Sequence, residues 1–180
     1  MRTDYLFMRE IEHVLAALMP SNRVVMRVCL HTGMRLGDVL SLRTAEIKRQ
    51  FWVVEAKTKK RRRVNLTDDL IAQIMAQSGT LWAFPGRKPG THRTRQAVWA
   101  DVKRAAKAFR LWQNVAPHSF RKVYAVELLR ACGDPAKVQR ALNHSRPATT
   151  AIYMMAAELL AAKQKKRALT FERRRATMLE

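Results

Sequence analysis

The hydrophobic residues of the first forty positions recur with the spacing of helices. Between positions 6 and 19 the apolar side chains that share one helical face are Phe7, Ile11, Val14, Leu15 and Leu18. Pro20 and Ser21 end this first helix. A second apolar pattern follows from position 24 to the turn at 31–33, and a short third helix is expected over 36–42.

The pattern then changes to that of strands. Residues 51–55 and 63–66 have the composition of β-strands, and the segment 57–62 between them is basic at every position except Thr58. The two strands are therefore expected to form a β-hairpin with a basic tip. A helix over 70–77, capped by residues 67–69, and a further short strand over 81–84 complete this part.

The second half of the chain is expected to be helical. After a loop at 85–90 that is rich in Pro and Gly, helices are predicted over 94–109, 118–132 and 135–142. Another helix, opened by Ser145 and Pro147, carries Tyr153, and residues 156–180 form a basic helical tail. The expected fold class is mainly α with a small antiparallel β-sheet (α+β), and residues 1–180 are expected to form one domain.

Composition narrows the choice of partner. The chain has 180 residues with 35 Lys and Arg against 14 acidic residues, a net charge of +21. Such an excess is typical of proteins that bind nucleic acid, because neutralised phosphates release counterions. No apolar run approaches the roughly 18 residues of a membrane span. Without a signal-like apolar N-terminus, and with two cysteines outside any metal-binding spacing, the chain is expected to be cytoplasmic.

Six residues together could support transfer of a phosphoryl group to a tyrosine, although each alone is more often an ordinary surface or core residue. Arginines suit the negative charge of a phosphorane-like transition state, and a histidine can donate a hydrogen bond to it. A tyrosine, whose pKa is normally near 10, is the nucleophile, and a lysine can protonate the leaving oxygen. The candidates are Arg35, Lys57, His118, Arg121, His144 and Tyr153.

Three ordered segments resemble those of the tyrosine recombinases, or phage integrases. They are His31-Thr-Gly-Met-Arg-Leu-Gly-Asp-Val-Leu-Ser-Leu42, Pro117-His-Ser-Phe-Arg121, and Ala141-Leu-Asn-His-Ser-Arg-Pro-Ala-Thr-Thr-Ala-Ile-Tyr153. In the third segment, two threonines precede the tyrosine and the histidine stands nine positions before it, as in the family. Three such segments in order are far more specific than any one alone.

The resemblance implies a role for each candidate. Arg35 and Arg121 bind the phosphate, while His118 and His144 handle protons or donate hydrogen bonds. Tyr153 is the nucleophile. The hairpin lysine of the family is best matched by Lys57, with Lys59 as the runner-up. The resemblance implies no metal and no cofactor.

The same resemblance shows where the chain departs from the family. Asn143 stands in place of a usual Gly, Lys122 in place of a His, and Asp38 in place of a Glu. The separate N-terminal core-binding domain of most members is expected to be absent, so the chain is read either as an isolated catalytic domain or as a minimal recombinase. Part of the tail, 156–162, is apolar enough to dock on a neighbouring subunit or on its own core.

The implied function is site-specific DNA recombination through a 3′-phosphotyrosyl intermediate, in an integrase or invertase of a bacterium, phage or mobile element. The implied partners are double-stranded DNA, further copies of the chain as a dimer on one site and a tetramer in synapsis, and accessory DNA-bending proteins. Two alternatives stay open: a DNA-binding regulator that keeps the fold without catalysis, and a type IB topoisomerase-like enzyme.

Overall fold

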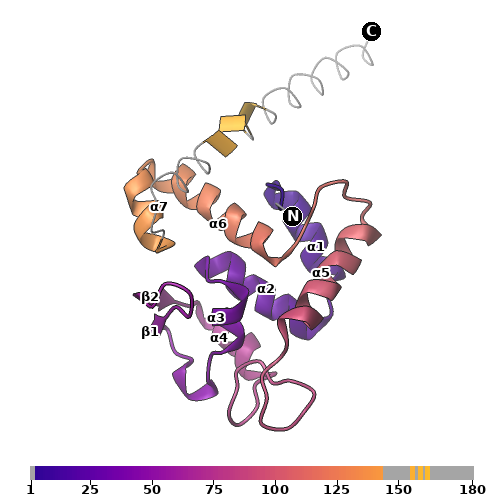
Figure 1. The fold of residues 1–180 in the computed structure, drawn as a ribbon, viewed down its shortest axis with the longest axis vertical. Coiled ribbons are helices and arrows are strands. Elements are labelled where there is room, and N and C mark those ends of the chain that lie inside the picture. The colour runs from indigo at the N-terminus through magenta and orange to yellow at the C-terminus, as the bar shows by residue number, and fades with distance from the viewer. Residues whose placement is uncertain (1–2, 144–154, 157, 160, 163–180) are drawn as a thin grey trace.

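The computed structural model describes residues 3–143, 155–156, 158–159 and 161–162, and in this part the chain is mainly helical with one small antiparallel sheet (Figure 1). The expected fold class is confirmed. The helices are α1 (Met8–Ala17), α2 (Pro20–Thr32), α3 (Leu36–Leu40), η1 (Thr44–Glu46), α4 (Asp68–Met75), α5 (Arg95–Ala108), α6 (Pro117–Cys132) and α7 (Pro135–Ala141). The strands are β1 (Gln50–Val54) and β2 (Arg61–Asn65).

Helix boundaries follow local backbone chemistry. Pro20 occupies the first turn of α2, where its missing N–H costs no hydrogen bond. Gly33 ends α2 in the left-handed conformation, with φ of 65°. A Cβ added at Gly33 would lie 2.3 Å from Cδ1 of Tyr124, so the turn requires glycine for space as well as for conformation. This turn leads directly into α3.

The hairpin forms as expected, but its tip is shorter than the basic segment. Phe51 pairs with Val64, and Val54 pairs with Arg61, so the ladder includes the last two basic residues assigned to the tip. Alternation along β2 buries Arg62 and Val64 and exposes Arg61 and Arg63. The turn is therefore confined to residues 55–60.

The expected strand at 81–84 is wrong. Its backbone groups bond to two different segments: Ala83 N–H donates to Leu42, and the carbonyl of Phe84 accepts from Arg93. Only isolated bridges result, such as the one between Arg43 and Trp82. A continuous ladder needs one partner strand, and here the partner changes within two residues.

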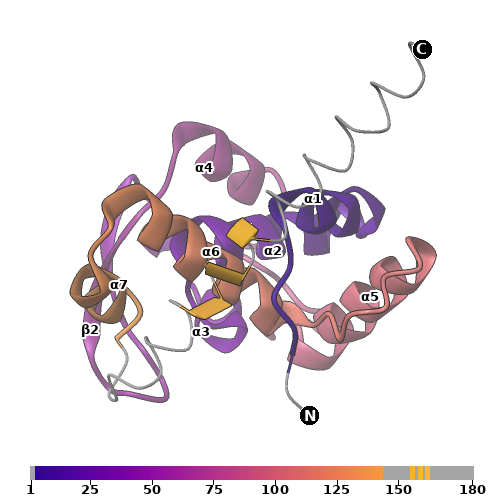
Figure 2. The same cartoon turned by 90° about the horizontal axis from the view of Figure 1, so that it is seen from above.

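The core forms where the helices meet around α2, which packs against α1, α3, α4 and α6 (Figures 1 and 2). Its apolar face buries Val25, Met26, Val28 and Cys29 completely or nearly so. Each large aliphatic side chain buried in this way contributes about 1.5–3 kcal/mol. The packing fixes the C-terminal end of α2 against α6, and that end leads into the candidate site.

The C-terminal part is described only in places. The described residues of 155–162 are helical, and Ala156 is buried against α6. The helix predicted to carry Tyr153 lies outside the described residues. In the described part of the chain, no helix is long and apolar enough to cross a membrane.

Candidate active site

Arg35 is positioned by the turn between α2 and α3. It is the N-cap of α3 in an extended conformation, so its side chain leaves the backbone just before the helix begins. Its guanidinium donates a 2.7 Å hydrogen bond to Oε2 of Glu55, at the end of the hairpin. A quarter of the side chain stays exposed, which leaves Arg35 open to a ligand.

Arg121 reaches the same place from α6. Its side chain is only 2% exposed and donates to the carbonyls of Gly33, at 2.5 Å, and of Leu142, at 2.6 Å. It also lies 3.9 Å from Oε1 of Glu55. Arg121 therefore holds together the end of α2, the end of α7 and the hairpin, and its position depends on all three.

Glu55 is the residue that sequence reasoning missed. It is fully buried between the guanidinium groups of Arg35, Arg62 and Arg121, and Thr58 donates a 2.8 Å hydrogen bond to it. Burial raises its pKa, but the hydrogen bonds from Thr58 and Arg35 and the charges of Arg35 and Arg121 outweigh this, so the pKa lies below its ordinary value. The available signal was a single acidic residue within an otherwise basic hairpin.

A second buried carboxylate, Asp38, connects α3 to the hairpin turn. Its Oδ1 accepts a 3.0 Å hydrogen bond from the backbone N–H of Ala56, and its Oδ2 lies 4.0 Å from Arg35. The departure from the usual Glu thus keeps an acid at this position. Because Ala56 directly precedes Lys57, the bond restrains the backbone beside the candidate lysine.

The two candidate lysines differ in their surroundings. Both are exposed, and Lys59 takes a left-handed conformation, with φ of 57°, in the turn itself. The positive charge of Lys57 contributes to the lowered pKa of His118. Lys57 therefore acts electrostatically on the pocket that holds His118.

His118 stands at the beginning of α6, on the same helical face as Arg121. Desolvation of its imidazole and the nearby positive charges of Arg121, Lys122, Arg35 and Lys57 together lower its pKa to about 4. The ring is therefore neutral at pH 7. A neutral imidazole donates a hydrogen bond through one ring nitrogen and accepts through the other.

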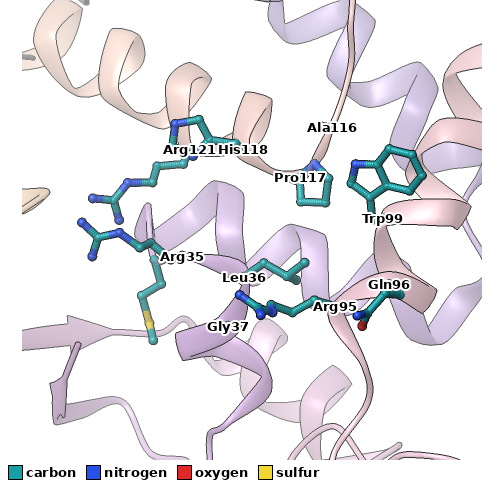
Figure 3. A pocket seen from close by; sticks show the side chains of 11 residues that line it. Arg35, Leu36, Gly37, Arg95, Gln96, Trp99, Ala116, Pro117, His118 and Arg121 are labelled. Carbon is teal, nitrogen blue, oxygen red and sulfur yellow. The ribbon is translucent and has the colours of Figure 1, made fainter. Parts of the chain in front are cut away.

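Arg35, His118 and Arg121 border a pocket of about 550 Å³ (Figure 3). The guanidinium groups of Arg35 and Arg121 lie near each other at one end, with His118 beside Arg121. The beginning of α5 forms the opposite wall through Arg95, Gln96 and Trp99. The pocket thus joins an arginine-lined end to a wall with basic, amide and aromatic side chains.

His144 and Tyr153 lie outside the described residues. The structure does describe the residue that precedes His144: Asn143 has φ of 50°, in the left-handed region. Asn tolerates this conformation better than most residues other than Gly, which explains why the departure from the usual Gly is compatible with the fold.

The cysteines take no part in the pocket as described. Both are free thiols, and burial raises the pKa of the Cys29 thiol to about 12. Among the described residues, no group of three His, Cys, Asp or Glu side chains gathers in a way that could hold a metal ion.

Comparison with known proteins identifies the family of this chain. Residues 5–159 match the phage integrase family. This chain belongs to the phage integrase family. A putative integrase/recombinase, y4qK, of Sinorhizobium fredii is 32% identical over 154 residues, which cover 81% of this chain and 50% of that relative. The chain thus spans half the length of this curated relative.

Two solved structures share the fold of this integrase-family chain. The catalytic domain of bacteriophage HP1 integrase matches with a TM-score of 0.62 and 22% identity, over 86% of this chain and 88% of that one. The XerH site-specific recombinase bound to its difH substrate, in a pre-cleavage complex, matches with a TM-score of 0.68 and 22% identity, over 83% and 49%. The fold of this chain is that of a catalytic domain of the family.

Proposed function

We propose that this chain is the catalytic domain of a site-specific DNA recombinase that cleaves and rejoins strands through a 3′-phosphotyrosyl intermediate. The observation that carries the proposal is the convergence of Arg35 and Arg121 on Glu55 at one end of a pocket that also holds His118. Segments far apart in the sequence are needed to build this arrangement.

The proposed step is an in-line displacement at phosphorus. The oxygen of Tyr153 forms a bond to the phosphorus while the bond to the 5′-oxygen breaks, and the strand ends as a 3′-phosphotyrosyl ester with a free 5′-hydroxyl. Arg35 and Arg121 bind the non-bridging oxygens, whose negative charge increases in the transition state. Attack by a 5′-hydroxyl on the ester reverses the step and rejoins a strand.

The remaining candidates handle protons and hydrogen bonds. Neutral His118 donates a hydrogen bond to a non-bridging oxygen, and its companion His144 is proposed to accept the proton that the hydroxyl of Tyr153 loses. Lys57 is proposed to protonate the leaving 5′-oxygen. The low pKa of His118 supports a hydrogen-bonding role over general acid catalysis, because little imidazolium is present at pH 7.

Double-stranded DNA is the proposed substrate. The net charge of +21 supports it, as does the pocket wall formed by Arg95 and Gln96, whose side chains suit phosphates and base edges. Related structures support it further, since the XerH structure contains the difH substrate. Binding is expected to weaken steeply with salt.

The assembly is proposed to be a dimer on one site and a tetramer when two sites meet, because each exchange joins strands from two duplexes. Accessory DNA-bending proteins are proposed to help bring the sites together. The proposed location is the cytoplasm of a bacterial host, in keeping with a phage or other mobile element.

The test is to trap the covalent intermediate. The probes are a pool of duplexes, each with a random half-site. In each duplex the top strand is nicked a short stretch beyond the half-site. Cleavage therefore releases a short fragment, and without that fragment the strand cannot be rejoined. Adducts that survive denaturation are isolated and sequenced, and the enriched duplex becomes the probe. Wild-type protein is expected to form an adduct with it, and Tyr153→Phe is expected to form none.

The matched control is Tyr124→Phe, which removes the same hydroxyl from a residue of α6 and should leave the adduct unchanged. An adduct that persists in Tyr153→Phe overturns the assignment of the nucleophile. Sequence-specific binding with no adduct favours a regulator. Plasmid relaxation without exchange between two sites favours topoisomerase-like activity.

A further inference from the structure

The start of α5 forms one wall of the pocket and is held at two points. One is Arg93, just before the helix, and the other is Asp101, inside it. Both points bind the side chain of Asn22, in the first turn of α2. Between these two points along the chain stand the α5 residues that line the pocket, which are Arg95, Gln96 and Trp99 (Figure 3).

Asn22 uses both ends of its amide group. Its Oδ1 accepts a 3.1 Å hydrogen bond from the guanidinium of Arg93, and its Nδ2 donates a 2.8 Å hydrogen bond to Oδ2 of Asp101. An arginine can only donate and a carboxylate can only accept, so the amide has one possible orientation. Asn22 is 5% exposed, and a buried amide that loses a partner costs free energy. The two bonds therefore favour one placement of α5 against α2.

Asp101 ties α5 to the turn before α2 as well. Its Oδ2 also accepts a 3.0 Å hydrogen bond from the backbone N–H of Met19, and its Oδ1 accepts one of 2.6 Å from Arg104. Burial raises the pKa of Asp101, but the hydrogen bonds from Asn22, Arg104 and Met19 and the charge of Arg104 outweigh this and lower it. The carboxylate is therefore charged at pH 7. A buried charge is costly away from its partners, so they define where this turn of α5 lies.

Arg93 fixes the point at which α5 begins. Its backbone N–H donates a 2.8 Å hydrogen bond to the carbonyl of Phe84. The next residue, Thr94, is the N-cap of α5, and its hydroxyl accepts a 3.2 Å hydrogen bond from the N–H of Ala97. The first turn of the helix thus follows directly from a residue that is held by both its backbone and its side chain.

We propose that Asn22 and Arg93 are positioning residues for Gln96: they set where its amide meets a base edge of the DNA. Gln96 stands three residues after Arg93 and five before Asp101, so anchors on both sides limit translation and rotation of α5. A glutamine amide suits the edge of an adenine, but only when it is held at the right depth. The proposal rests on the proposed function, since it concerns the wall that contacts DNA.

The test measures base preference. The enriched nicked duplex is changed one base pair at a time, and preference is the ratio of the dissociation constants of the changed and the parent duplex. Gln96→Ala identifies the base pair that Gln96 contacts, as the position where a wild-type preference of about tenfold to a hundredfold disappears. Asn22→Leu is expected to lose most of the preference at that same position, although Asn22 is buried. Its preference at other positions and its rate of adduct formation at saturating DNA should stay near wild type.

Arg93 is tested by a matched pair. Arg93→Lys keeps a cation that can donate to Asn22 and should keep most of the preference. Arg93→Met fills similar space without a donor and should lose the preference as Asn22→Leu does. Loss of one positive charge weakens binding to every duplex alike, so the ratio separates positioning from phosphate binding. This pair also decides the outcome if Asn22→Leu does not fold. Wild-type preference in Arg93→Met or in a folded Asn22→Leu overturns the proposal.

General loss of stability is controlled with Ile74→Val, which trims the buried core on α4. This variant should melt earlier but keep the wild-type preference. An equal loss of preference in Ile74→Val and Asn22→Leu overturns the proposal, as does a Gln96→Ala variant that changes no position. Failure of the wild-type protein to enrich any duplex or form any adduct contradicts the proposed function instead, so the two failures are distinguishable.

Discussion

Arg35 and Glu55 form a 2.7 Å ion pair that joins the turn after α2 to the end of the β-hairpin. The carboxylate is fully buried, while a quarter of the arginine side chain is exposed toward the pocket. Glu55 also faces Arg62 and Arg121, at 3.5 Å and 3.9 Å. One buried negative charge thus holds three guanidinium groups close together, which would otherwise repel one another.

Replacing Glu55 with Gln should destabilise the protein and disorganise the arginines. The neutral amide preserves the shape but leaves buried positive charge uncompensated, so the free energy of unfolding is expected to fall by about 2–3 kcal/mol. Urea denaturation measures the change. Glu12→Gln, an exposed site on α1 that loses the same charge, is the control and should be nearly neutral.

Glu55 should also contribute to acid sensitivity. Because its pKa in the folded protein is lowered from 4.5, the unfolded chain binds a proton more readily. The stabilisation is therefore complete above pH 4.5 and is lost as the pH falls below that value. Denaturation from pH 6 to pH 3 should show a smaller loss of stability in Glu55→Gln than in the wild type; parallel curves would contradict this.

His118 should titrate far below an ordinary histidine. Its pKa of about 4 lies below the 6.5 of the unfolded chain, so acidification from pH 6.5 toward 4 favours the unfolded state, which binds more protons. NMR of the imidazole C–H resonances should give a midpoint near 4 for His118. A midpoint near 6.5 for His118 would contradict the described surroundings.

Gly33→Ala should be more destabilising than the same change at another left-handed glycine. Both Gly33 and Gly133 have φ near 64°, and a Cβ costs about 1–2 kcal/mol in that conformation. At Gly33 it would also overlap the ring of Tyr124, whereas at Gly133 nothing lies within 4 Å. Thermal denaturation should show the larger loss at Gly33, by about 1–3 kcal/mol.

The steric origin can be checked by removing the ring. In the double variant with Tyr124→Ala, the extra loss at Gly33 should shrink, because the added Cβ no longer meets an aromatic carbon. Additive losses would show that the ring is not the cause.

The two hairpin lysines can be separated with a modified leaving group. On a probe whose 5′-bridging oxygen at the cleaved phosphate is sulfur, the leaving thiolate needs no proton. Lys57→Ala should therefore slow cleavage of the oxygen probe but leave cleavage of the sulfur probe near wild type. Lys59→Ala should cleave both probes normally; the reverse pattern would assign the proton donor to Lys59.

The sequence determined most of the fold because the signals for most helices and for the hairpin lie within a few residues of the element itself. Three such signals depend only on residues within a few positions of one another. They are the apolar spacing in α1, α2 and α5, the glycine at position 33, and the threonine caps Thr67 and Thr94. The strand predicted at 81–84 failed for the opposite reason. Its apolar pattern was suitable, but among the described residues no single strand pairs along its length, because its partners come from distant parts of the chain.

The same division applies to the site. Arg35, His118 and Arg121 stand in recognisable local segments, so the sequence alone predicts them as site residues. Glu55 was not, because its importance comes from where β1 ends relative to the turn after α2 and the middle of α6. Tertiary structure alone decides whether an acid in a basic hairpin points to water or is buried among arginines. Local sequence determines which groups a chain carries, while long-range packing decides which of them share an electrostatic environment.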